Sequence, residues 1–99
     1  MNGVKNMQSV VVDDTEHCVV CGSPYIHIHH VFFGTANRKI SDKFGYVIPL
    51  CQMHHTAQTH GIHFNKDLDI QWKRICQQHF ESNTGNREAF IALFGRSYM

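Results

Sequence analysis

This 99-residue sequence has no large excess of charge of either sign, no long apolar run and no internal repeat. Nine Lys and Arg against eight Asp and Glu leave a formal net charge of +1, which argues against nucleic-acid binding by bulk electrostatics alone. No apolar run approaches the roughly 20 residues needed to cross a bilayer. The first residues show no basic segment followed by an apolar one, so no export signal is expected. These absences predict a soluble, cytoplasmic protein without a membrane partner.

The chain also lacks the length needed for a large hydrophobic core. A protein of this size buries only about 60–65% of its unfolded surface, so additional cross-links would help it fold. Disulfides are unusual in a reducing cytosol, and a bound metal is therefore the expected cross-link. Nine histidines and four cysteines supply more potential ligands than packing would require.

These potential ligands are concentrated in three segments. Residues 51–63 hold one cysteine and four histidines within thirteen positions, and residues 18–21 and 28–31 add two cysteines and two histidines. We expect the three segments to converge on bound metal.

Cys18 and Cys21, together with Cys51 and His54, follow the C-x2-C…C-x2-H spacing of a structural zinc site. Soft thiolates favour Zn2+ over Mg2+, and four protein ligands leave no open coordination position. This site is therefore expected to hold structure and not to perform chemistry. Zinc-finger peptides bind the metal with about 10–16 kcal/mol, enough to decide whether so small a chain folds. Buried free cysteines are the alternative.

A strand and a loop are predicted in the middle of the chain. Residues 25–32 alternate in polarity as a strand does, which places His27 and His29 on one face and His30 on the other. Residues 34–45 are polar, basic and bounded by glycines, which predicts a loop with at most one helical turn.

A second strand and a short helix should follow. Residues 46–50 predict the strand. The helix is expected from Cys51 to about His60, with Gly61 as its C-terminal stop. In this order of strand, loop, strand and helix, candidate ligands lie both before and after the loop.

The C-terminal half is predicted to be helical. One helix should begin near Asn65 or Asp67 and run to about Asn83, and another is framed by Asn86 as N-cap and Gly95 as terminator. Three side chains of the last helix are expected to face inward: Phe90, Leu93 and Phe94. On the longer helix, the spacing predicts a packing face made of Leu68, Trp72, Ile75, Cys76 and His79.

One domain in three parts is the simplest organisation of residues 1–99. Residues 1–16 should be a flexible segment with one short strand at 10–12. Residues 17–63 should form the metal-binding core, and residues 64–99 a helical extension.

Ile-His-His-Val at residues 28–31, followed after a strand by Leu-Cys-x-x-His-His, resembles the HNH endonucleases. The resemblance covers about residues 18–63, close to half of the chain, and the G-[VI]-H element at 61–63 is shared with small phage and prophage proteins of this kind. The expected fold is therefore α+β, with a ββα-metal (HNH, or His-Me finger) core, a structural zinc knuckle pair and two C-terminal helices.

The resemblance also implies a set of site residues. It assigns His29, His55 and His63 as ligands of a catalytic divalent cation such as Mg2+, Mn2+ or Zn2+. His60 competes with His63, because many family members place a ligand about one helical turn after the helix histidine. His30 is implied as the general base that takes a proton from the attacking water.

The sequence departs from the family at one position. The family's middle asparagine, which helps to orient the base, falls at Tyr46. Asn37 or a backbone carbonyl is expected to take over that role, because an acceptor on the second imidazole nitrogen fixes the tautomer.

The implied function is metal-dependent hydrolysis of DNA with little sequence specificity, in phage or prophage recombination or DNA processing and with a partner from that machinery. Arg38, Lys39 and Lys43 are the candidate phosphate contacts. The alternative is a non-catalytic zinc-binding module that recognises nucleic acid or a protein on a degenerate HNH scaffold. A structural subunit of a phage particle is a third hypothesis.

Three further candidates have ordinary explanations. His17 and His27 are predicted to be solvated surface residues. Cys76 is predicted to be a small buried apolar residue, although its spacing from His79 matches half of another knuckle.

Overall fold

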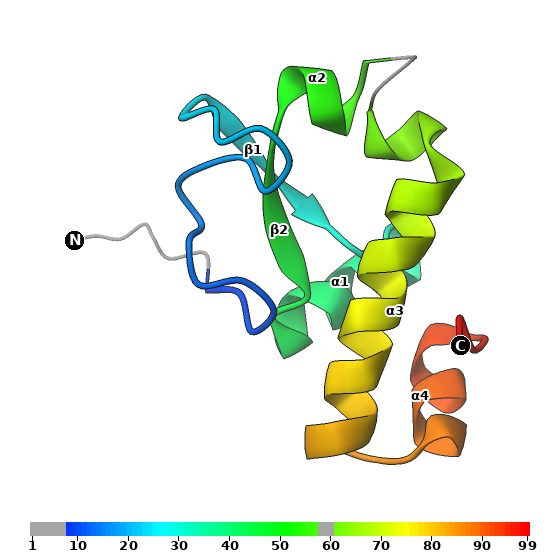
Figure 1. Ribbon diagram of the computed structural model, residues 1–99. Helices are drawn as coiled ribbons and strands as arrows, with labels where there is room; N and C mark the ends of the chain where they lie inside the picture. Colours follow the sequence, from blue (N-terminus) through cyan, green and yellow to red (C-terminus); the bar gives the residue numbers. More distant parts are fainter. Residues whose placement is uncertain (1–7, 58–60) are drawn as a thin grey trace.

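The computed structural model describes residues 8–57 and 61–99, and these form a small mixed α+β fold around a two-stranded antiparallel sheet (Figure 1). Strand β1 (Ile26–His30) pairs with β2 (Val47–Cys51). The other elements are, in chain order, α1 (Thr35–Phe44), α2 (Gln52–His55), the 3-10 helix η2 (Ile62–Phe64), α3 (Lys66–Asn83) and α4 (Arg87–Phe94). The predicted α+β class is confirmed. The competing ligand candidate His60 and residues 1–7 lie outside the described residues.

Helix α1 replaces the loop predicted between the strands, so that prediction was wrong. The bounding glycines are the ends of the helix: Gly34 precedes it, and Gly45 adopts the left-handed conformation (φ 76°) that commonly ends helices. Ile40 and Phe44, one turn apart, pack against the core. Ser41 is buried and donates a 2.6 Å hydrogen bond to the Tyr46 carbonyl, which ties α1 to the start of β2.

Helix α2 is a single turn that ends at His55, so the predicted helix to His60 was too long. Gly61 is not a left-handed stop, because its backbone is extended (φ −73°, ψ 146°). A side chain at this position would collide with the backbone, since a Cβ on Gly61 would lie 2.6 Å from the Ala57 carbonyl oxygen. Close approach of two backbone segments therefore explains this glycine.

The strand predicted at residues 10–12 is also absent from the described part of the chain. The Ser9 hydroxyl instead accepts hydrogen bonds from the N–H groups of Val11 and Val12, both at 3.2 Å, and so forms a turn. The Val10 N–H donates to the carbonyl of Gly45, the residue that follows α1, at 3.0 Å. Local side-chain hydrogen bonding has replaced the pairing that β-branched residues would favour.

The two C-terminal helices have the predicted bounds. The side chains of Asn65 and Asn86 cap them, accepting from backbone N–H groups three residues later at 3.1 and 2.8 Å. Phe90 and Phe94 are buried as predicted, but Leu93 is 39% exposed and does not face the core. Helix α4 turns back along α3 (Figure 1) and contacts both α3 and α1.

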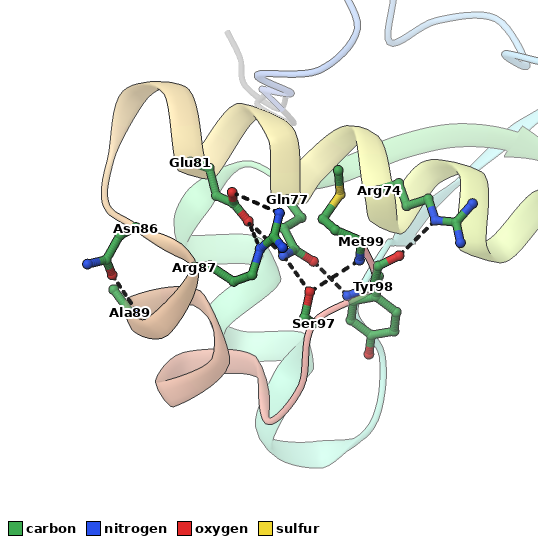
Figure 2. A network of polar contacts seen from close by, with 9 residues as sticks. All are labelled: Arg74, Gln77, Glu81, Asn86, Arg87, Ala89, Ser97, Tyr98 and Met99. Carbon is green, nitrogen blue, oxygen red and sulfur yellow. Dashed lines mark hydrogen bonds and ion pairs between the residues drawn. The ribbon is translucent and has the colours of Figure 1, made fainter.

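A polar network joins α3 to the C-terminal residues (Figure 2). Gln77 is fully buried, accepts from the Tyr98 N–H at 2.8 Å and donates to the Ser97 hydroxyl at 3.0 Å. Arg74 donates to the Tyr98 carbonyl at 2.7 Å. The ring of Tyr98 then lies 5.7 Å from that of Phe32, two residues beyond β1. The C-terminal residues thus close the core over the end of the strand that carries His29 and His30.

Candidate metal centres

Four ligand atoms from three segments meet in a first cluster. Cys18 and Cys21 flank a turn in which the Gly22 N–H donates to the Cys18 carbonyl at 2.8 Å, with Gly22 at φ 80°. Cys51 ends β2 and His54 lies in α2. Cys51 Sγ is 3.2 Å from His54 Nδ1 and 3.7 Å from Cys21 Sγ. All four ligand atoms lie within 4.8 Å of one another, which is compatible with a metal such as zinc.

The pKa values of two thiols in this first cluster are shifted in opposite directions. Burial raises the pKa of Cys18, but hydrogen bonds from the backbone N–H groups of Cys51 and Cys21 outweigh it and lower that pKa to about 6. The Ser23 N–H lowers the pKa of Cys21, but desolvation and the adjacent thiols act in the other direction and the net shift is upward. Thiolates this close together repel, so a cation would let them ionise together.

Three histidines form a second cluster. His29 lies in β1, His55 ends α2 and His63 lies in η2. Each pair of ring centroids is 5.0 or 5.1 Å apart, and one nitrogen of each ring lies within 4.8 Å of the others. The structure therefore brings together the three residues that the family resemblance assigned to a second metal.

His29 is the buried member of this second cluster. It is 2% exposed, and its Nε2 has no hydrogen-bond partner among the described residues. Burial, and then the charges of His55 and His63, lower the pKa of His29 to about 3. The pKa of His55 is also lowered, by burial and then by His63 and His27. Neutral imidazoles with a free nitrogen are the form that binds divalent metals, so these residues fit such an ion.

Acid should destabilise the fold through His29. Its pKa is about 3 in the fold against an ordinary 6.5, so the unfolded chain takes up a proton first as the pH falls. The contribution of neutral His29 to the stability of the fold is complete above about pH 6.5 and is lost toward pH 3. As the pH falls below 6.5, the unfolding free energy of the wild type should decrease faster than that of His29→Gln. We expect the two slopes to differ by about 1 kcal/mol per pH unit. Urea unfolding of both proteins, each with one equivalent of Zn2+, measures this, and equal slopes would contradict it.

His30 lies against α1. Its Nε2 is 3.4 Å from Oδ1 of Asp42, and its side chain is 15% exposed. A hollow of about 590 Å³ at this place is lined by His30, Thr35, Arg38, Lys39 and Asp42. Lys43 lines a different hollow, next to the N-terminal segment. Of the three predicted phosphate contacts, Arg38 and Lys39 thus line the same hollow as His30, whereas Lys43 does not.

Asp42 is a candidate that the sequence analysis missed. Asn37 or a backbone carbonyl was expected beside His30, but the carboxylate of Asp42 occupies that place. Tyr46, at the position of the family's asparagine, is fully buried, and its hydroxyl lies 3.3 Å from His79 Nδ1. Tyr46 is therefore a core residue, and the carboxylate of Asp42 is the charged group that lies beside His30.

The remaining histidines and cysteine differ in their surroundings. His17 bonds Asp14 at the surface, with Nδ1 2.8 Å from Oδ2. Cys76 is fully buried, as predicted, and burial raises the pKa of its thiol. His27 is exposed, but its Nδ1 lies 3.3 Å from His55 Nδ1, which its predicted role as a free surface residue did not anticipate.

No family model matches this chain, and no curated protein or solved structure is significantly similar to it. Within residues 8–57 and 61–99, no helix combines the length and apolar character that a membrane span requires. Any functional assignment therefore depends on the geometry of the two clusters and of the His30 hollow.

Proposed function

We propose that the protein is a metal-dependent endonuclease of the HNH type, which hydrolyses DNA phosphodiester bonds with little sequence specificity. The observation that carries the proposal is the cluster of His29, His55 and His63. Its member His29 directly precedes His30 in β1. Three protein donors leave coordination positions for water and a phosphate oxygen, as catalytic sites require. The antiparallel pair β1 and β2, with α1 between them in the chain and α2 directly after β2, supports a ββα-metal core, since ligands lie on the first strand and on α2.

Each part of the site has a defined chemical role in this proposal. A divalent cation would stabilise the charge that develops on the scissile phosphate and the leaving oxygen. His30 would take a proton from the attacking water, since histidine is the side chain that most often serves as a general base. The carboxylate of Asp42, 3.4 Å from Nε2 of His30, would favour a proton on that nitrogen and leave Nδ1 to accept the proton of the water.

The surroundings of the site suggest which DNA it acts on. Arg38 and Lys39, in the hollow beside the base, would contact backbone phosphates, which carry no sequence information. Phe33 and Phe64 are 41% and 58% exposed; the Phe33 ring lies 4.9 Å from that of His63, and Phe64 is the next residue. Exposed rings of this kind stack on unpaired bases, which favours single-stranded or locally opened DNA.

Cleavage assays test the proposal directly. The protein is incubated with supercoiled plasmid and, separately, with single-stranded DNA, in EDTA and then in Mg2+, Mn2+, Ni2+ or Zn2+. We expect cleavage only with a divalent cation, faster cleavage of the single strand, and none by His63→Ala in the same cation. A folded, zinc-loaded wild type that is inert in every cation would contradict catalysis by the isolated chain.

A non-catalytic zinc-binding module is the second candidate. The burial of Tyr46 in the core, in place of the family's asparagine, favours it, as does the near-neutral charge. A recombination or phage DNA-processing protein would then be the partner that brings the module to DNA. Both candidates include the zinc knuckle, but only the nuclease requires His30 for a chemical step.

A further inference from the structure

His27 has no role in the proposed reaction, yet it contacts the second cluster. It lies in β1, two residues before His29 and therefore on the same face of the strand. Its Nδ1 is 3.3 Å from Nδ1 of His55, and the two rings meet edge to face with centroids 5.5 Å apart. His27 does not belong to the group whose ligand atoms all lie within 4.8 Å of one another.

The contact between the two Nδ1 atoms restricts the tautomer of His55. Two ring nitrogens at this distance form a hydrogen bond only if one carries a proton and the other does not. If His27 were the donor, the proton of neutral His55 would sit on its Nε2, and neither nitrogen of His55 would be free for a metal. If His55 donates through Nδ1, its Nε2 keeps a lone pair that can bind metal.

We propose that His27 is a positioning residue: it accepts the Nδ1–H hydrogen bond of His55 and so presents His55 Nε2 to a divalent cation shared with His29 and His63. The inference rests on the metal centre of the proposed function and adds an outer partner to it. Metal-bound histidines generally donate their second ring N–H to such a partner, which fixes the tautomer and the ring orientation. Here another imidazole takes the place of the usual carboxylate or carbonyl.

His27 acts from outside the ligand set in this arrangement. The ligand set remains three imidazoles, and an open position stays available for water and substrate. A fourth imidazole on the metal would close that position and turn the centre into a structural one. The two roles therefore predict different coordination spectra.

Titration with Co2+ tests this role, because its visible absorption reports ligand number. Protein already carrying one equivalent of Zn2+ is titrated with Co2+, and Zn2+ affinity at the second cluster is then measured by competition. His27→Phe, which keeps a ring but has no acceptor, should bind about 10–100-fold more weakly with an unchanged spectral shape. His27→Asn, whose amide oxygen can accept from Nδ1–H, should recover most of that loss. His17→Phe, a matched exposed histidine outside the cluster, should bind like the wild type.

Each other result overturns the role of His27 in a recognisable way. If the wild type and His27→Phe bind Zn2+ at the second cluster with equal affinity, His27 has no positioning role, while the metal centre itself stands. A His27→Phe spectrum that reports the loss of a ligand would show His27 to be a ligand and not a positioning residue. A wild type that binds no second metal would overturn the metal centre itself, and this result separates the failure of the proposed function from that of the inference. Circular dichroism of each variant shows that the fold is retained.

Discussion

Replacing Cys51 with serine should leave the chain largely unfolded and unable to retain zinc at neutral pH. Cys51 ends β2, and its sulfur contacts both Cys21 of the N-terminal turn and His54 of α2, so its loss disconnects three segments. In zinc-finger peptides the metal contributes about 10–16 kcal/mol, which is comparable to the roughly 5–15 kcal/mol that holds an ordinary domain folded. Far-UV circular dichroism and zinc content, determined by dye release, measure the effect.

Cys76→Ala is the matched control for this substitution. Cys76 is also a buried cysteine but lies outside the cluster, so its replacement should retain the zinc and cost roughly 1 kcal/mol of stability. A Cys51→Ser protein that folds and binds zinc as tightly as the wild type would show that this cluster does not hold the structure together.

Replacing His30 with alanine should lower the rate of DNA cleavage by about 10²- to 10⁴-fold, the usual contribution of a positioned general base. DNA binding should hardly change, because the phosphate contacts and the metal ligands remain in place. Single-turnover cleavage and fluorescence anisotropy of labelled DNA separate the two effects. His17→Ala controls for the loss of a histidine, since His17 is exposed and paired with Asp14 at the surface.

Substitutions of Asp42 should give an intermediate result. Asp42→Leu removes the carboxylate 3.4 Å from His30 Nε2 and should cost about 10–100-fold in rate, whereas Asp42→Asn retains a polar oxygen there and should cost less. If His30→Ala cleaves DNA as fast as the wild type, His30 is not the base, and the binding module becomes the better hypothesis.

Local signals in the sequence were sufficient for much of this fold. Two cysteines with two residues between them, followed by a glycine, indicated the turn at residues 18–22, and that glycine does have a positive φ. Helices α3 and α4 were predictable because Asn65 and Asn86 cap them through their own side chains and Gly95 ends the second in the left-handed conformation. Each of these signals acts within a few residues.

What the sequence did not reveal depends on distant contacts. Helix α1 has glycines at both ends and a polar composition, and its Ile40 and Phe44 pack against the core, where the ring of Phe44 meets that of Phe94 from the C-terminal half. Asp42 faces His30 only because this segment is helical, so the wrong prediction of a loop concealed it. The contact of His27 with His55 likewise depends on the strand pairing that sets His27 opposite Leu50, shortly before α2, and no local signal indicated it.

The covering of Phe32 has a consequence for the order in which the chain can fold during synthesis. Phe32 is almost fully buried, and its cover includes the rings of Phe94 at 4.2 Å and Tyr98 at 5.7 Å, residues made about 60 positions later. Every proposed metal ligand precedes residue 64 and so leaves the ribosome before these rings. Zinc can therefore organise the first half of the nascent chain while its aromatic core still lacks part of its cover.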